Sequence, residues 1–290
     1  MPKLFVVATP IGNLDDLSPR MKEALSECDL ICAEDTRVTS KLTQVLGVRK
    51  PMISCHRHNE DIKKQGIVER MLSEDMTVSL TCDAGTPGIS DPGQELVAAA
   101  WDAGIEIIPV SGPSAIVTAL SVSGFDTRNF SFYGFLPREN KALSEALDGI
   151  IQAGVSPAVL YESPHRVTEL LGHIAQKQPS SRVTVCCDLT KKFERIDRGC
   201  VSQVLETLRQ NPKTEKGEYC VVWAFEKEGP KEAPEGALLS PELRLVQKLL
   251  DGKETDEATD ELKREGVKRN ELYRAKLALQ KLAARLNEDT

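Results

Sequence analysis

The amino-acid sequence predicts the α/β fold class, with two α/β domains and a small helical appendage at the C-terminus. Short apolar, β-branched runs alternate with segments of helical periodicity through most of the chain, which is the pattern of parallel α/β sheets. The 290 residues suffice for two domains of roughly 100–150 residues each. Residues 229–240 are rich in Pro, Gly and Glu and indicate a linker. After this linker the apolar residues recur with helical spacing only. We therefore expect domains at residues 1–118 and 119–228 and an appendage at 241–290.

Strands and helices are expected to alternate in the first domain. The expected strands are residues 4–8, 30–33, 52–55, 78–82 and 105–110, and the expected helices are 18–27, 39–46, 60–72 and 93–103. Ser18 before Pro19 is a typical helix start, because a serine oxygen caps free N–H groups and proline lacks an N–H. Gly47 is a typical helix end. A helix of small residues, 115–123, is expected to lead into the second domain.

The second domain repeats the alternation. Its expected strands are residues 130–133, 158–161, 183–187, 194–199 and 219–225, and its expected helices are 141–151, 165–175 and 201–209. The last strands follow one another closely, which predicts a mixed sheet. The appendage should contain helices at 241–250, 256–264 and 269–287, and the linker separates it from the rest of the chain.

Composition excludes several classes of protein. The formal net charge of −7 and the pI near 5.4 argue against coating of nucleic acid by bulk electrostatics, so any RNA contact must be local. The eight cysteines include no CxxC pair and mostly lie in apolar stretches, which predicts reduced core thiols and no metal site. The apolar run at residues 4–8 is too short for a signal peptide or a membrane span, so we expect a cytoplasmic protein without a membrane partner.

Three loops of small residues follow predicted strands, and they indicate a ligand site. They are residues 9–13 (TPIGN), 83–93 (DAGTPGISDPG) and 111–115 (SGPSA). Ligands of α/β sheets bind beyond the carboxyl ends of the strands, and small residues let a ligand approach the backbone. A tight Gly/Pro turn capped by Asp91 is the structural alternative for the second loop. Neither a GxGxxG nor a GxxxxGK[ST] motif is present, so typical dinucleotide and P-loop sites are not predicted.

An ordered series of motifs carries a resemblance to a known family. The motifs are ATPIGNL (8–14), AEDTR (33–37), HNE (58–60), DAGTP (83–87), GFLP (134–137), YESPHR (161–166), LTK (189–191) and KGE (216–218). This series resembles the ribosomal RNA small subunit methyltransferase I family, which belongs to the tetrapyrrole (corrin/porphyrin) methylase superfamily. The resemblance spans about residues 4–228.

The resemblance implies a fold, a cofactor and a reaction. The fold is the tetrapyrrole-methylase type, class III among methyltransferases that use S-adenosyl-L-methionine, with the cofactor in a cleft between the two α/β domains. The implied reaction is methylation of the 2′-hydroxyl of a cytidine ribose in the decoding region of 16S rRNA. The implied partners are small-subunit rRNA or the assembled 30S subunit, and a second copy of the chain in a homodimer.

Site residues are expected from the loops and the motifs. We expect the cofactor to contact Pro10, Asp83, Ala84, Gly85, Ile89, Ser114 and Ala115. A ribose hydroxyl is a weak acid and needs a base or a cation that stabilises the alkoxide, and the motifs offer Lys191, Glu162, Asp35 and His165. The residues expected on the RNA side are Arg37, His58, His165 and Arg166, since a guanidinium stays charged and binds phosphate in bidentate fashion. Structural ion pairs Asp35–Arg37 and Glu162–Arg166, and an ordinary polar loop residue at His58, are the alternatives.

Two other functions remain open at this point. A methylase of a tetrapyrrole or another small molecule would use the same fold and cofactor site, and fold alone does not exclude it. A non-enzymatic RNA-binding or ribosome-assembly factor would bind through the helical tail and would transfer no methyl group.

Overall fold

The computed structural model describes residues 1–56, 60–226 and 240–288, with the backbone alone for 280–288. The chain divides into two compact units, Met1–Lys227 and Glu228–Thr290. His58 and residues 229–239 of the expected linker lie outside the described residues.

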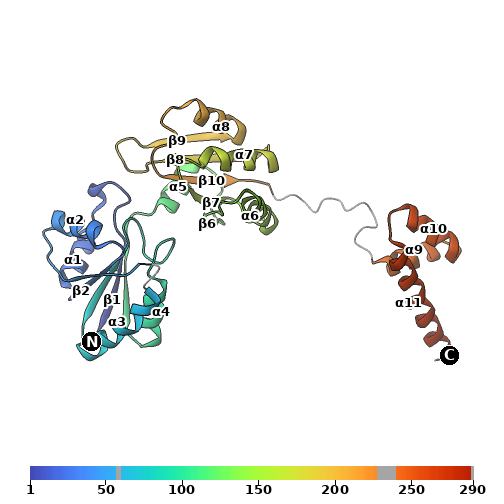
Figure 1. Ribbon diagram of the computed structural model, residues 1–290, viewed down its shortest axis with the longest axis horizontal. Coiled ribbons are helices and arrows are strands. Elements are labelled where there is room, and N and C mark those ends of the chain that lie inside the picture. The colour runs from blue at the N-terminus through green and yellow to red at the C-terminus, as the bar shows by residue number, and fades with distance from the viewer. Residues whose placement is uncertain (57–59, 227–239, 289–290) are drawn as a thin grey trace. The chain divides into compact units, whose positions relative to one another are not determined.

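The first sheet is parallel throughout, with the strand order β3-β2-β4-β1-β5 (Figure 1). Its strands are β1 (Lys3–Val7), β2 (Leu30–Ala33), β3 (Met52–Ser54), β4 (Thr77–Thr81) and β5 (Glu106–Val110). Each predicted strand is confirmed to within one residue at either end. The parallel arrangement places the carboxyl ends of all these strands at one edge, where the loops of the candidate site begin.

Helices cover both faces of this sheet. The helices are α1 (Pro19–Glu27), α2 (Thr36–Leu46), α3 (Glu60–Ser73) and α4 (Gln94–Asp102), with a 3₁₀ turn at Leu14–Asp16. Alternate residues of a strand point to opposite faces. Leu4 accordingly packs in the cluster with α3 and α4, whereas Phe5 packs in the cluster with α1.

Helix α2 begins one turn earlier than predicted. The sequence indicated a start at Thr39, but the helix begins at Thr36 because Asp35 caps it: the carboxylate accepts a 2.8 Å hydrogen bond from the backbone N–H of Arg37. The capping role also determines where the Asp35 side chain lies in the candidate site.

The second sheet is mixed, as predicted. Its order is β6-β7-β10-β8-β9, and its strands are β6 (Ser131–Phe135), β7 (Ala158–Glu162), β8 (Arg182–Cys187), β9 (Arg195–Cys200) and β10 (Tyr219–Ala224). The pair β6/β7 is parallel, and the other neighbours are antiparallel. The predicted strands are confirmed to within two residues.

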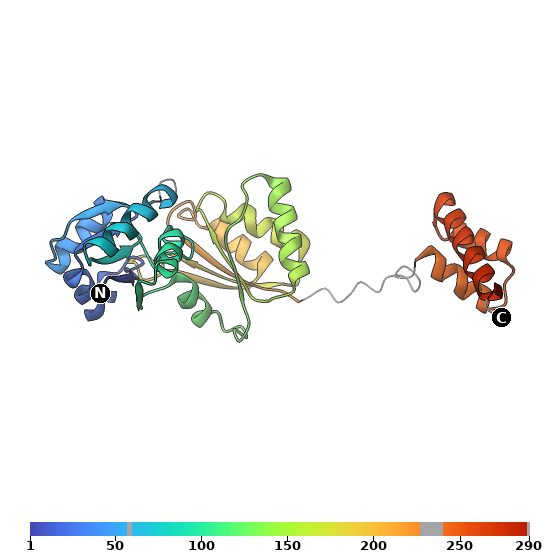
Figure 2. The same ribbon diagram turned by 90° about the horizontal axis from the view of Figure 1, so that it is seen from below.

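Two hydrophobic clusters lie on opposite faces of the second sheet (Figures 1 and 2). The larger one contains residues of α6 (Asn140–Ala153), α7 (Val167–Lys177) and α8 (Val201–Gln210). The smaller one contains Ile116 and Leu120 of α5 (Ala115–Ser123), together with Ile11 from the loop after β1. Helix α5, in which the sequence placed the domain boundary at 118/119, therefore packs on the second sheet.

Residues 240–288 contain three helices, α9 (Pro241–Leu250), α10 (Thr255–Arg264) and α11 (Arg269–Glu288), which confirms the predicted helical tail. Leu245, Leu262 and Leu272 form a small buried core of their own. No helix in the described part of the chain is both long and apolar enough to cross a bilayer. All eight cysteines are free thiols and all but Cys200 are buried, in agreement with the expected core thiols.

Candidate active site

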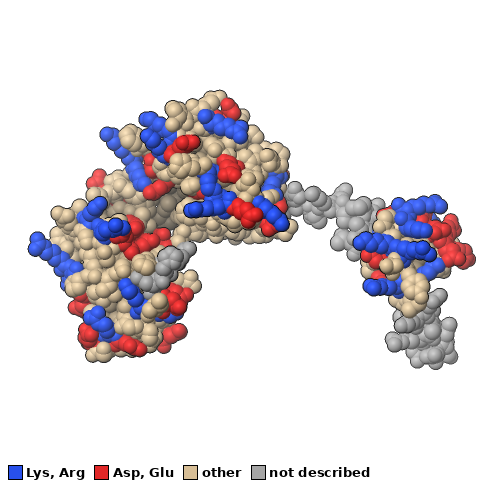
Figure 3. Space-filling model, viewed as in Figure 1, with Lys and Arg blue, Asp and Glu red and all other residues tan. Residues whose placement is uncertain are grey.

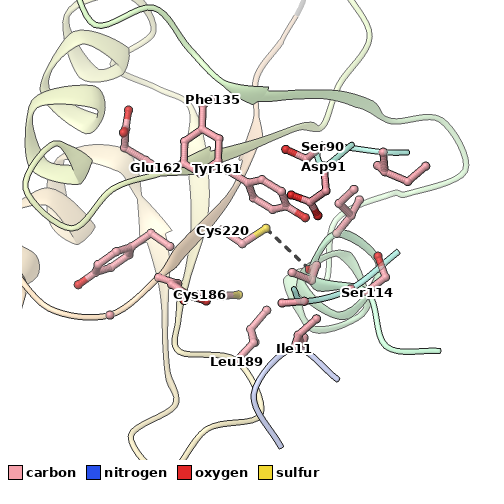
Figure 4. Close-up of a pocket in the computed structure, with 18 of the residues that line it drawn as sticks. Ile11, Ser90, Asp91, Ser114, Phe135, Tyr161, Glu162, Cys186, Leu189 and Cys220 are labelled. Carbon is pink, nitrogen blue, oxygen red and sulfur yellow. Dashed lines mark hydrogen bonds between the residues drawn. The ribbon is translucent and has the colours of Figure 1, made fainter. Parts of the chain in front are cut away.

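A pocket of about 390 Å³ lies between the loop edge of the first sheet and the second sheet, within residues 1–226 (Figure 4). The first domain contributes Ile11, residues 84–86 and 89–91, and Ser114–Ile116 at the start of α5. The second domain contributes Phe135, Tyr161–Pro164, Cys186, Leu189 and Gly217–Cys220. Five predicted cofactor residues, Ala84, Gly85, Ile89, Ser114 and Ala115, thus line one cavity together with Glu162.

The three loops of small residues meet at one sheet edge, as expected. Thr9 and Gly85 exchange backbone hydrogen bonds of 2.8 and 3.1 Å, which join the first loop to the second. Gly85 has a φ of +85°, a conformation that side chains with a Cβ rarely adopt. A Cβ on Gly112 would lie 3.0 Å from the Cβ of Ala8, so the third loop also passes close to the first. Small residues are therefore needed where these backbones approach one another and the pocket.

Tyr161 and Asp91 form part of the polar wall of the pocket and point toward one another (Figure 4). Burial raises the pKa of the Tyr161 phenol, and the nearby Cys220 and Asp91 contribute to the shift. The phenol is consequently neutral at physiological pH and acts as a hydrogen-bond donor. Phe132 and Phe135 pack against the Tyr161 ring, with centroids 5.1 and 5.6 Å away, and hold it in place.

Glu162 lies at the end of β7 and is 2% exposed. Its Oε1 accepts a 2.7 Å hydrogen bond from the backbone N–H of Ser163 and lies 3.4 Å from an Arg166 nitrogen. Its Oε2 is buried and has no hydrogen-bond partner among the described residues. A buried carboxylate oxygen without a partner is unfavourable, and the Glu162 side chain points away from Tyr161 and Asp91 (Figure 4).

Arg166 is held by the protein, because it donates a 2.8 Å hydrogen bond to the carbonyl oxygen of Pro137 in addition to its contact with Glu162. His165 is exposed in the turn before α7 and does not line the pocket. The structure therefore contains the predicted Glu162–Arg166 pair and leaves His165 on the surface.

Lys191 reaches from the second domain onto the first. Its ammonium lies 2.9 Å from a Glu218 carboxylate oxygen and 3.5 Å from Asp188 Oδ1. Its aliphatic stem covers Gly12: a Cβ on that glycine would lie 2.5 Å from Lys191 Cγ and 2.7 Å from Cε. The Lys191 side chain thus lies at the rim of the pocket. It contacts Glu218, which lines the pocket, and Gly12, whose neighbour Ile11 lines the pocket.

The charge state of Lys191 follows from these contacts. Partial burial alone would lower its pKa, but the ion pairs with Glu218 and Asp188 outweigh burial and raise the pKa above the ordinary lysine value. The sequence left open whether this lysine is a neutral base or a cation. The geometry favours the cation.

Asp35, Arg37 and Asp83 form a separate polar group on the first domain. Arg37 Nε donates to Asp35 Oδ1 at 3.0 Å, and hydrogen bonds from Arg37 lower the pKa of Asp35 to about 2. Asp83 accepts a 3.1 Å hydrogen bond from the backbone N–H of Asp35, and burial raises its own pKa. Asp83 and Pro10 line a second pocket of about 210 Å³ beside α2 instead of the larger one.

Sequence reasoning missed several residues of the larger pocket. Tyr161 and Glu218 belong to the YESPHR and KGE motifs but received no role, and Asp91 was considered only as a turn cap. The signal available for Glu218 was its charge, opposite to that of the motif lysine Lys191. No sequence pattern indicates that Phe135, on a different strand, packs against Tyr161.

Comparisons with known proteins agree with this arrangement. Residues 3–205 match the family model described as Tetrapyrrole (Corrin/Porphyrin) Methylases. The crystal structure of uroporphyrin-III-C-methyltransferase from Thermus thermophilus shares the fold, with a TM-score of 0.51 and 17% identity, over 76% of this chain and 93% of that chain. The two-sheet fold with a pocket between the sheets therefore defines a methyltransferase of the tetrapyrrole-methylase class.

Closer relatives narrow the family. A protein of Escherichia coli O157:H7 named ribosomal RNA small subunit methyltransferase I is 37% identical over 279 residues, which cover 96% of this chain and 96% of that protein. A protein of Synechocystis with the same name is 43% identical over 225 residues, 76% of this chain and 78% of that protein. The chain belongs to the ribosomal RNA small subunit methyltransferase I family within the tetrapyrrole methylases.

Proposed function

We propose that the chain uses S-adenosyl-L-methionine to methylate the 2′-hydroxyl of a cytidine ribose in the decoding region of 16S rRNA. The observation that carries the proposal is the charged Lys191, held by Glu218 and Asp188 at the rim of a ligand-sized pocket. The names of the relatives, which specify small-subunit ribosomal RNA, support the choice of substrate.

The pocket residues fit S-adenosyl-L-methionine. A volume of about 390 Å³ lies within the roughly 300–1,000 Å³ typical of small-molecule sites. Ile89, Phe135 and Leu189 offer an apolar lining to an adenosine. Ala84, Gly85 and Ser114 leave the backbone accessible. When bound, the cofactor supplies a methyl group already activated by its sulfonium.

The chain's own task is to orient the ribose hydroxyl and stabilise the alkoxide that forms as its proton leaves. Because the ion pairs keep Lys191 charged, it stabilises the alkoxide and does not remove the proton. Asp35, with its pKa near 2, is a weak base, whereas Glu162 lies in the pocket and is the better candidate for the base. Arg37, 87% exposed, and Arg166 are proposed to bind RNA phosphates.

The experiment that tests this function uses labelled S-adenosyl-L-methionine and small subunits that lack the modification, followed by mapping of the labelled nucleotide. We expect one labelled cytidine ribose. Lys191→Ala should lower the single-turnover rate far more than the cofactor affinity. Lys177→Ala, which removes a lysine of α7 paired with Asp148 of α6, should leave both unchanged. Absence of label in rRNA with the wild-type chain would refute the function.

The same assay distinguishes two other functions. Transfer of label to a tetrapyrrole and not to rRNA would identify a small-molecule methylase, to which only the fold of the uroporphyrin methyltransferase points. Binding to subunits without any transfer would identify an assembly factor. A homodimer stays a prediction from the family resemblance, and a cytoplasmic location stays a prediction from the short apolar run at residues 4–8.

A further inference from the structure

Phe193 lies in the connection between β8 and β9 and is an exposed aromatic side chain beside two lysines. Its side chain is 70% exposed. The Lys192 ammonium lies 5.7 Å from the ring centroid, and the Lys213 ammonium lies 5.5 Å from it. One lysine precedes Phe193 in the chain, whereas the other comes from the segment between α8 and β10. Lys and Arg side chains gather on this side of the second domain (Figures 1 and 3).

Backbone hydrogen bonds hold the Phe193 loop in a defined shape. The N–H of Lys191 donates to the carbonyl of Asp188 at 2.9 Å, and the N–H of Glu194 donates to the carbonyl of Lys191 at 3.1 Å. The Glu194 carboxylate accepts a 2.6 Å hydrogen bond from the N–H of Thr190. Asp188 and Thr190 have φ values of +52° and +66°, which are uncommon outside glycine and concentrate at functional sites. The loop that presents Phe193 is therefore ordered at some conformational cost.

The segment that carries Lys213 is also ordered and leads to the pocket. The Thr214 hydroxyl donates a 2.6 Å hydrogen bond to the carbonyl of Leu208, and the N–H of Lys216 donates to the carbonyl of Lys213 at 3.1 Å. Gly217 and Glu218 follow and line the pocket. A Cβ on Gly217 would lie 2.8 Å from Asp188 Oδ2, so the Phe193 and Lys213 segments approach each other closely. Both segments are therefore continuous in sequence with the pocket rim at Lys191 and Glu218.

The cations over the ring do not by themselves account for so much exposed apolar surface, because a cation–π contact at an exposed site is weak. An unpaired nucleobase can stack on an aromatic ring, and neighbouring lysines can then pair with the phosphates on either side of that base. Sequence-specific RNA recognition mostly targets single-stranded loops, bulges and ends, where unstacked bases can take up such a contact.

We propose that Phe193, with Lys192 and Lys213, is a stacking platform for an unpaired nucleobase adjacent to the nucleotide that is methylated. The inference rests on the proposed function, because it needs an RNA substrate at the Lys191 rim. It adds a substrate contact outside the cofactor pocket. The platform accepts any base, since every base has a π face, and so it positions the RNA without reading its sequence.

The test measures binding of unmodified small subunits to the full chain at several salt concentrations, with methylation measured in parallel. Phe193→Ala should weaken binding by roughly 5- to 150-fold, the range expected for one stacked base, and should leave the salt dependence unchanged. Phe193→Trp should keep wild-type affinity because it keeps a stacking face, whereas Phe193→Leu, apolar but not aromatic, should behave like the alanine variant. Lys192→Ala and Lys213→Ala should each lower the slope of log affinity against log salt by about 0.7.

Trp101→Ala is the matched control, since Trp101 is an aromatic residue 65% exposed on α4 of the first domain. Its replacement should leave subunit binding unchanged. Binding of S-adenosyl-L-methionine should be unchanged in every variant, which also shows that the variants fold. Wild-type affinity in Phe193→Ala, or equal affinity of the Leu and Trp variants, would overturn the platform even if the wild-type chain methylates rRNA. Failure of the wild-type chain to methylate rRNA would instead refute the proposed function.

Discussion

The contact between Gly12 and the stem of Lys191 allows the role of this lysine to be tested without changing the lysine. In Gly12→Ala the new Cβ would come within 2.5–2.7 Å of two Lys191 carbon atoms, well inside van der Waals contact. The lysine stem is flexible, so it should move away and take its ammonium out of reach of Glu218, which now lies 2.9 Å away. A displacement of about 1 Å at a reacting centre is worth about 10²-fold in rate.

We therefore expect Gly12→Ala to lower the single-turnover methylation rate by about 10²-fold at saturating subunits. Gly12 has a φ of +149°, so alanine should also destabilise the fold by roughly 1–3 kcal/mol through backbone strain. Gly47→Ala is the control for strain, because Gly47 has a φ of +71° and a Cβ there would meet no heavy atom within 4 Å. That variant should lose stability but keep the rate.

A double-mutant cycle decides whether the effect acts through the lysine. If it does, Gly12→Ala combined with Lys191→Ala should be no slower than Lys191→Ala alone, because the side chain to be displaced is already missing. Full additivity of the two losses, or a wild-type rate in Gly12→Ala, would refute the reasoning. Cofactor affinity measured by calorimetry should change little in either single variant.

Four further predictions concern the pocket, the RNA side, pH and the tail. Gly85→Val should weaken cofactor binding at least tenfold in a folded protein, because valine is strained at a φ of +85° and occupies the pocket wall, and unchanged affinity by calorimetry would contradict this. Arg37→Ala and Arg166→Ala should weaken subunit binding and lower its salt dependence by about 0.7 in slope each, measured by binding titrations, with a smaller effect on the saturated rate. Because the pKa of Lys191 is raised in the folded state, its ion pairs should stabilise the fold fully below the unfolded lysine pKa of about 10.4, and this contribution should be lost as pH rises through the folded pKa. Thermal melts at alkaline pH should show this loss of stability in the wild-type chain and not in Lys191→Ala. The single-turnover rate should show no ionisation of this lysine between roughly pH 7 and 9. A chain truncated after residue 229 should keep cofactor binding but bind subunits more weakly, since the pocket is built within residues 1–226, and loss of cofactor binding would show that the tail belongs to the site.

The sequence predicted the elements well because most of them carry strong local signals. Apolar runs predicted the strands of both sheets. Ser18-Pro19 predicted the start of α1 and Gly47 predicted the end of α2, and both agree with the structure. The predicted start of α2 at Thr39 was wrong because Asp35 was not recognised as the cap, whose carboxylate accepts a hydrogen bond from the backbone N–H of Arg37.

The candidate site could be predicted only as far as the loops and motifs themselves reach. The meeting of the small-residue loops follows from the parallel order of the strands, and it was predicted. The position of Pro10 and Asp83 in a second pocket, and the contact of Phe135 with Tyr161, depend on side-chain packing. Sequence spacing contains no information on such contacts.

The position of Ile11 links the stability of the fold to the shape of the site. This residue belongs to the loop after the first strand, yet it is 8% exposed and packs in the cluster of the second sheet with Ile116 and Leu189. Moving the two domains apart would expose these side chains, at about 1.5–3 kcal/mol for each large aliphatic group. The walls of the pocket are therefore set during folding, before any ligand arrives, and a ligand does not have to supply the free energy of domain closure. A change in the ligand preference of this pocket would therefore have to preserve a lining residue that also belongs to the folding core.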